Sequence, residues 1–143
     1  NWWTEKDKEE FKTRTDVLTA QYDEFEVFPD LKVNGEFTLG ENIGDLGGLS
    51  IALKAYKMSL AGSEAPVMDN YTGEQRLFIG FAQSYLGKTR EEALRVQVNT
   101  DSHSPNNFRV NGVVRNLPEF YTAFKVQETD SLYLAPEKRV KIW

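Results

Sequence analysis

The 143-residue sequence contains no cysteine and only one histidine, His103. The absence of cysteine excludes disulfides, thiolate metal ligands and a thiol nucleophile, and it leaves the redox compartment open. A catalytic zinc site normally takes three protein ligands from His, Asp, Glu or Cys and keeps a fourth position open. One histidine cannot build a two-histidine site, so this chain is not expected to hold catalytic zinc by itself.

Long apolar runs and clusters of positive charge are also lacking. No run of about 18 apolar residues could cross a bilayer, and the chain does not begin with a basic segment followed by an apolar one. We therefore expect no membrane segment and no targeting leader in these residues. Seventeen basic and 22 acidic side chains give a net charge of -5, without a dense group of Lys and Arg, so nucleic acid is not an expected partner.

The composition that remains is that of a folded globular protein. Hydrophobic residues make up 40% of the chain and charged residues 27%, which is typical of a chain with a moderate core. The length falls within the usual range for one domain. No internal repeat, low-complexity segment or linker divides the sequence. We expect residues 1–143 to form a single unit.

Apolar spacing and helix-start residues predict an all-α fold. The first helix is expected over about residues 5–25, with Thr4 as its cap. Its buried face is expected to carry Phe11, Leu18, Tyr22 and Phe25. A loop with at most a short extended segment should then lead into a second helix that contains Glu41 and Asp45.

Further helix starts are predicted from capping residues and prolines. Two capping boxes, each a Thr followed three residues later by Gln or Glu, indicate a third and a fourth helix. The residues concerned are Thr72 with Gln75 and Thr89 with Glu92. Another start is expected at Pro105 and a last one at Asn116. The tail, which ends in Trp143, is expected to dock on the folded chain.

The stretch "LGENIGDLGG" places Glu41 and Asp45 four positions apart, so both carboxylates should share one helix face. Three interpretations are open. The two acids can stabilise a helix start through the helix dipole, they can be a metal ligand and the residue that supports it, or they can form a catalytic acid–base pair. Glycine inside a helix costs about 1 kcal/mol relative to alanine, so the glycines here indicate a close approach to the backbone.

The polar segment "TDSHSPNNFR" carries the other candidate residues. Asp101, two residues before His103, can hold the imidazole in one tautomer and stabilise its charged form. His103 is then either a donor to developing negative charge or a residue that closes a loop hydrogen bond. Arg109 can clamp a carboxylate or carbonyl through its planar guanidinium, or it can be an ordinary surface ion-pair partner.

Several motifs of this chain, in order, resemble the neprilysin-like zinc endopeptidases, the M13 peptidases. They are "NWWT", "LGENIGDLGGL", "FAQSY", "TDSHSPNNFRVNG", "NLPEFYTAF" and "PEKRVKIW". The resemblance extends over essentially the entire chain. It implies the helical C-terminal portion of a zincin-type metallopeptidase catalytic domain, from an enzyme that hydrolyses peptide bonds of oligopeptides with a metal-activated water.

The resemblance also implies roles for individual residues. Glu41, in the family's E-N-x-x-D motif, is similar to the third zinc ligand, and Asp45 to the partner of a zinc-binding histidine. His103 matches the histidine that stabilises the oxyanion of the tetrahedral intermediate, and Asp101 the acid that orients it. Arg109 matches the arginine that binds a substrate carbonyl.

Two further positions are implied to contact substrate. Ser84 and Tyr85 fall where the family lines the pocket for the residue after the scissile bond. The cysteines that cross-link animal members are absent, with Leu86, Val126 and Val140 at three such places, so the chain resembles bacterial members more closely. By the same resemblance, the parent protein is expected to act outside the cytoplasm, whether periplasmic, secreted or membrane-anchored.

The H-E-x-x-H helix of this family, which would precede "WW", is not in the sequence. We therefore expect this chain to be inactive as an isolated peptidase and to need the missing N-terminal part of the same protein to complete a zinc site. Apolar surface left uncovered should favour self-association. The alternative hypothesis is a non-catalytic helical binding or interaction module derived from this fold.

Overall fold

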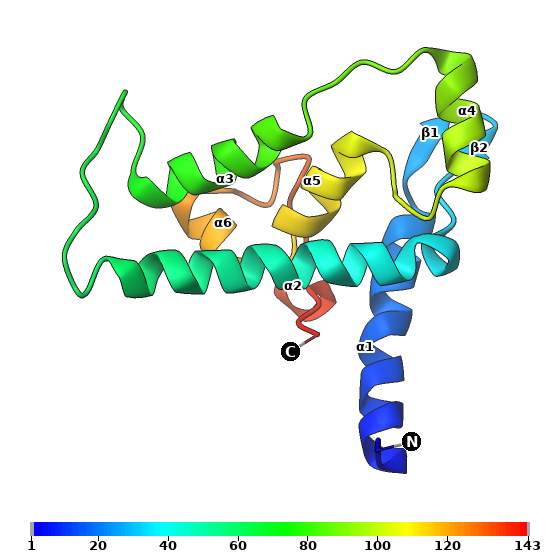
Figure 1. The fold of residues 1–143 in the computed structure, drawn as a ribbon, viewed down its shortest axis with the longest axis horizontal. Helices are drawn as coiled ribbons and strands as arrows, with labels where there is room; N and C mark the ends of the chain where they lie inside the picture. Colours follow the sequence, from blue (N-terminus) through cyan, green and yellow to red (C-terminus); the bar gives the residue numbers. More distant parts are fainter. Residues whose placement is uncertain (1, 143) are drawn as a thin grey trace.

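The computed structural model describes residues 2–142, which form a mostly helical fold with one small hairpin (Figure 1). The helices are α1 (Glu5–Asp23), α2 (Gly35–Ser59), α3 (Gly73–Ser84), α4 (Glu91–Thr100), α5 (Asn106–Val114) and α6 (Pro118–Phe124), with a 3-10 turn at Pro136–Lys138. Strands β1 (Glu26–Phe28) and β2 (Leu31–Lys32) pair antiparallel, Glu26 opposite Lys32. The helical prediction is confirmed, and the short extended segment is this hairpin.

Helix α2 is the long central element, and α1, α3 and α5 all contact it. Figure 1 shows α1 crossing α2 near the N-terminal end of α2, while α3 and α5 lie beside the rest of that helix. Side chains from all of these helices meet in one core. Its buried members include Leu18, Tyr22, Leu46, Leu49, Leu53, Phe78, Val113, Val114 and Leu117. The predicted apolar face of α1 is confirmed, with Phe11 and Phe25 partly buried against this core.

The predicted helix starts have mixed outcomes. Thr4 with Asp7 and Thr72 with Gln75 form capping boxes with both reciprocal hydrogen bonds, as expected. The box of Thr89 and Glu92 is wrong, because α4 begins at Glu91 after Arg90 and has no side-chain cap.

Asn116 does not cap a helix either, because its amide is used in the core. It donates to the Gln21 side chain at 2.8 Å and accepts from the Val140 backbone N–H at 2.8 Å. Val140 and Ile142 are buried, so the tail docks as predicted up to residue 142. Trp143, on which that prediction also fell, lies outside the described residues.

The second helix begins earlier than the acids within it suggest. Asn34 caps α2 by accepting from the Phe37 backbone N–H, so Glu41 lies six residues after the first helical residue, Gly35. The dipole effect is confined to the first turn, and the helix-start interpretation of Glu41 and Asp45 is therefore wrong. At Gly44 and Gly48 the expected close approach is wrong, because a Cβ there would meet no neighbouring atom within 4 Å. Gly47, in the same stretch, is buried.

None of the helices within residues 2–142 is long and apolar enough to cross a membrane.

Candidate functional site

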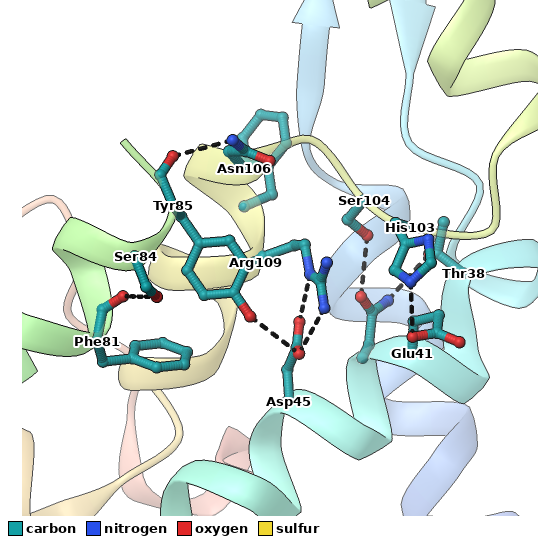
Figure 2. A network of polar contacts seen from close by, with 12 residues as sticks. Thr38, Glu41, Asp45, Phe81, Ser84, Tyr85, His103, Ser104, Asn106 and Arg109 are labelled. Atoms are coloured by element: carbon teal, nitrogen blue, oxygen red, sulfur yellow. Dashed lines mark hydrogen bonds and ion pairs between the residues drawn. The ribbon is translucent and has the colours of Figure 1, made fainter. Parts of the chain in front are cut away.

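His103 lies in the loop between α4 and α5, and its ring is held between two carboxylates, of which Figure 2 shows Glu41. Asp101 Oδ1 contacts the ring Nδ1 at 2.7 Å and also accepts from the His103 backbone N–H at 2.9 Å. On the other side of the ring, Nε2 is 2.9 Å from Glu41 Oε2 of α2. The predicted pair of Asp101 and His103 is thus present, and α2 adds a second acid to it.

The hydrogen bonds at this ring favour the charged form of Asp101. Donation from the His103 backbone N–H, followed by donation from its ring, holds the pKa of Asp101 below its usual value. Both ring nitrogens face a carboxylate oxygen, so both contacts are hydrogen bonds only when both nitrogens carry a proton. The two carboxylates therefore fix the directions in which the ring nitrogens can donate.

Asp45, one turn after Glu41, pairs with Arg109 of α5 rather than with His103. The guanidinium donates through Nε to Oδ2 and through Nη2 to Oδ1, both at 2.7 Å. The exposed fractions of the two side chains are only 19% for Arg109 and 11% for Asp45, so this is not a surface ion pair. Hydrogen bonding to Asp45 raises the pKa of Arg109. Because Asp45 takes Nε and Nη2, the Nη1 group is not committed to this pair.

Tyr85, directly after α3, completes this second cluster. Its hydroxyl donates to Asp45 Oδ1 at 3.2 Å, and the Arg109 guanidinium carbon lies 4.9 Å from its ring centre. Burial, with the charge of Asp45, raises the pKa of the Tyr85 phenol. The Asn106 amide, at the start of α5, donates to the Tyr85 carbonyl at 2.9 Å and so ties the end of α3 to α5.

Within residues 2–142, no hydrogen bond joins Ser84 to either cluster. Its hydroxyl donates to the Phe81 carbonyl of its own helix at 2.7 Å, as Figure 2 shows. Six of the seven residues predicted for the site therefore meet along one side of α2, and Ser84 lies beside them on the exposed end of α3.

Sequence reasoning overlooked a third set of polar residues between the two clusters. Asn42 is buried in α2, and its carbonyl oxygen accepts from the buried Ser104 hydroxyl at 2.9 Å. A signal for Asn42 was present, because it precedes Leu46 and Leu49 by four and seven residues and so lies on the core face of the helix. A polar side chain on that face must find a hydrogen-bond partner.

The described residues do not make a metal site by themselves. Nowhere in residues 2–142 do three or more His, Cys, Asp or Glu side chains come together as a metal would require. Glu41 and Asp101 both contact the His103 ring, and both carboxylates are half-exposed. A metal bound here would therefore need ligands from outside the described residues.

Two surface hollows of the described residues lie away from the site. One hollow of about 410 Å³ is lined by Trp2, Trp3, Phe11, Arg14 and Ile142 among others, and a second of about 430 Å³ lies around Gln21, Arg115 and Tyr133. None of the candidate residues lines either of them. The polar clusters, rather than a cavity, single out this side of α2.

Comparison with known proteins decides the family. The family model described as peptidase family M13 matches residues 1–140. The chain belongs to peptidase family M13. Among curated members it is 39% identical to neprilysin-1 of Caenorhabditis elegans and 37% identical to the neutral endopeptidase of Lactobacillus helveticus, and both alignments cover the whole chain.

Solved structures of M13 relatives contain this fold. The zinc metalloprotease Zmp1 of Mycobacterium tuberculosis, in complex with an inhibitor, matches with a TM-score of 0.97 and 50% identity over the whole chain, which covers 23% of that protein. PepO from Lactobacillus rhamnosis matches with a TM-score of 0.83 and 38% identity, and there the chain covers 21%. The expected bacterial resemblance is consistent with these two structures.

The M13 chain is a partial one. It spans about a fifth of the length of the curated relatives, 20% of neprilysin-1 and 20% of the Lactobacillus helveticus endopeptidase. The family is one of zinc metallopeptidases, while the described residues of this chain hold no metal site of their own.

Proposed function

We propose that residues 1–143 are the C-terminal part of the catalytic domain of a zinc metalloendopeptidase that hydrolyses oligopeptides outside the cytoplasm. The upstream H-E-x-x-H helix would lie in the missing N-terminal part of the same protein. The observation that carries this proposal is the His103 ring held between Asp101 and Glu41, with contacts of 2.7 and 2.9 Å. Membership of family M13 supports it.

In the longer protein, Glu41 supplies one zinc ligand. Bound zinc polarises a substrate carbonyl and activates its water. With Glu41 engaged as a ligand, Nε2–H of His103 would no longer have a carboxylate partner. Asp101 still holds Nδ1, so His103 can direct Nε2–H at the negative charge that develops on a substrate oxygen.

Arg109 binds the substrate carbonyl in this proposal. The bidentate contact with Asp45 fixes the plane of the guanidinium and leaves Nη1 as the donor for a ligand. The Tyr85 ring, stacked beside that guanidinium, and Ser84 line the pocket for the residue after the scissile bond. The Asp45 carboxylate is also the partner of a zinc-binding histidine from the missing part in this proposal.

The test compares the protein extended upstream through the H-E-x-x-H helix with its Glu41→Ala variant. We expect the parent to hold one zinc and to cleave a model peptide, and Glu41→Ala to lose both, because a zinc site with one ligand removed binds metal far more weakly. Glu36→Ala is the control, since Glu36 is an exposed acid of the same helix. It should retain zinc and cleavage.

Two results would overturn the proposal. If Glu41→Ala keeps the zinc affinity of the parent, then Glu41 is not a ligand. If the extended parent itself holds no metal, the binding-module hypothesis replaces the enzyme. The isolated 143-residue chain is expected to show no zinc-dependent cleavage, and measurable cleavage by the pure chain would contradict that expectation.

A further inference from the structure

A chain of buried hydrogen bonds connects the His103 loop to α2, next to the candidate site. The three side chains in it, Ser104, Asn42 and Thr38, are 0%, 1% and 3% exposed. The Ser104 hydroxyl donates to Asn42 Oδ1, Asn42 Nδ2 donates to Thr38 Oγ1, and Thr38 Oγ1 donates to the Asn34 carbonyl, each at 2.9 Å. Figure 2 shows the bond from Ser104 to α2 between the two ionic clusters.

Starting from Thr38, the direction of each hydrogen bond in this series fixes the direction of the next one. Thr38 spends its only hydroxyl proton on the Asn34 carbonyl, so it can only accept from Asn42. The amide nitrogen of Asn42 must therefore face Thr38, and its oxygen must face the loop. The Asn42 oxygen on α2 therefore requires a hydrogen-bond donor at position 104.

The location of this bond matters because it joins the neighbours of the two residues that meet at the site. Asn42 follows Glu41, and Ser104 follows His103. His103 has a side chain 41% exposed and so has little packing of its own. Asp101 belongs to the same loop, so it can orient the ring but cannot fix the loop on α2. Pro105 is buried beside Ser104, but its ring donates no hydrogen bond.

We propose that Ser104 and Asn42 are positioning residues for His103, whose buried hydrogen bond sets the distance between the imidazole and Glu41. This inference rests on the proposed function. The pair touches neither substrate nor metal, and it acts on the reaction only through the placement of His103. A misplacement of a donor by about 1 Å is enough to cost on the order of 100-fold in rate.

The experiment uses the zinc-loaded extended protein and a double-mutant cycle. Ser104→Ala and Asn42→Ala should each lower kcat by about 10- to 100-fold, with zinc content retained and KM little changed. Together they should lower kcat no further than either alone, because both break the same bond. In a His103→Ala background, Ser104→Ala should have no further effect on kcat. Ser104→Thr, which retains the hydroxyl, should restore part of the lost rate.

A second measurement does not depend on activity. Hydrogen exchange of the metal-free extended protein should show faster exchange in residues 101–105 for Ser104→Ala. Gln21→Ala is the matched control, because Gln21 also makes a buried amide bond, to Asn116 and the tail. It should speed exchange in the tail and leave residues 101–105 and kcat unchanged below the unfolding temperature.

The outcomes separate this inference from the proposed function. If His103→Ala leaves kcat unchanged, the proposed role of His103 fails, and the inference fails with it. If His103→Ala lowers kcat but Ser104→Ala does not, only the positioning role is overturned. A Ser104→Ala effect that persists at full size in the His103→Ala background also overturns it, because the serine would then act by another route. If Ser104→Ala does not fold, Asn42→Ala and Ser104→Thr decide by the same criteria.

Discussion

The ion pair of Asp45 and Arg109 is largely shielded from water and is geometrically matched, so neither residue is easily replaced alone. Arg109→Met leaves the Asp45 carboxylate largely buried, and the Tyr85 hydroxyl is then its one hydrogen-bond partner among residues 2–142. Breaking a buried pair from one side costs about 3–5 kcal/mol. We expect a loss near the lower end of that range in denaturant unfolding of the 143-residue chain, because both side chains keep some exposure.

Two variants check this attribution. Arg109→Met combined with Asp45→Leu removes both charges and should recover much of the lost stability. Asp30→Ala breaks a bidentate pair with Arg95 that is open to solvent, and its effect should be much smaller. Equal losses for Arg109→Met and Asp30→Ala would show that burial of the Asp45 pair contributes nothing.

Asp101 gives the loop a dependence on pH. Its pKa is lowered from the ordinary value of 3.8 by donation from His103, so the folded state binds the carboxylate form more strongly than the unfolded chain does. The stabilisation is therefore present above pH 3.8 and is lost as the pH falls through the lowered pKa. Asp101→Asn should destabilise the chain at pH 6, and this difference should shrink as the pH falls below 3.8. A difference between the two proteins that stays constant over that range would contradict the assignment.

The residue-scale predictions from sequence succeeded where the partners are close along the chain. Asp101 and His103 are two residues apart, and their contact follows from the local turn. The contact between His103 and Glu41 spans 62 residues, and no spacing rule could supply it, because it depends on how the loop docks on α2. The same holds for Asp45 and Arg109, which are 64 residues apart.

Helices α1 and α5 meet at a glycine, and this contact limits what can replace it. A Cβ on Gly112 would lie 2.6 Å from the Tyr22 hydroxyl oxygen and 3.1 Å from the Phe25 ring. Tyr22 is fully buried and cannot move aside freely. We expect Gly112→Ala to destabilise the chain by about 1–3 kcal/mol in denaturant unfolding, since overpacking outweighs the gain in helix propensity.

Gly80→Ala is the matched control for this contact. Gly80 is in the middle of α3, where a Cβ would meet no neighbouring atom within 4 Å. The same substitution should therefore raise the stability by about 0.5–1 kcal/mol. If Gly112→Ala unfolds at a denaturant concentration as high as that of Gly80→Ala, the close packing of α1 on α5 is not limiting.

At the scale of elements, local capping patterns predict a helix start only when the cap residue has no stronger use elsewhere. Thr4 and Thr72 are exposed, and both form the expected boxes. Asn116 has the same kind of local pattern, but its amide links Gln21 of α1 to Val140 of the tail, and α6 begins at Pro118 without it. That tertiary demand is invisible in the sequence around position 116.

The molecule as a whole presents an apolar face that its own core does not use. Phe37, Gly44, Ile51 and Met58 follow one another at seven-residue intervals on α2, so they share one face of the helix. Phe37, Ile51 and Met58 are 44%, 67% and 70% exposed. The chain spans about a fifth of the length of its M13 relatives. We expect the remainder of a longer protein to cover this face. In the isolated chain the same face is available to a second copy.

We expect the 143-residue chain to self-associate at high concentration and this face of α2 to drive it. Replacing Ile51 and Met58 with Lys should reduce the apparent mass in light scattering. The change moves the net charge from -5 to -3, since two positive charges are added, which weakens the repulsion between copies. A fall in association would therefore come from the lost apolar surface and not from charge. Val96→Lys, at an exposed apolar position of α4, should leave the mass unchanged. If the unmutated 143-residue chain stays monomeric at high concentration, this face of α2 does not drive association when it is uncovered.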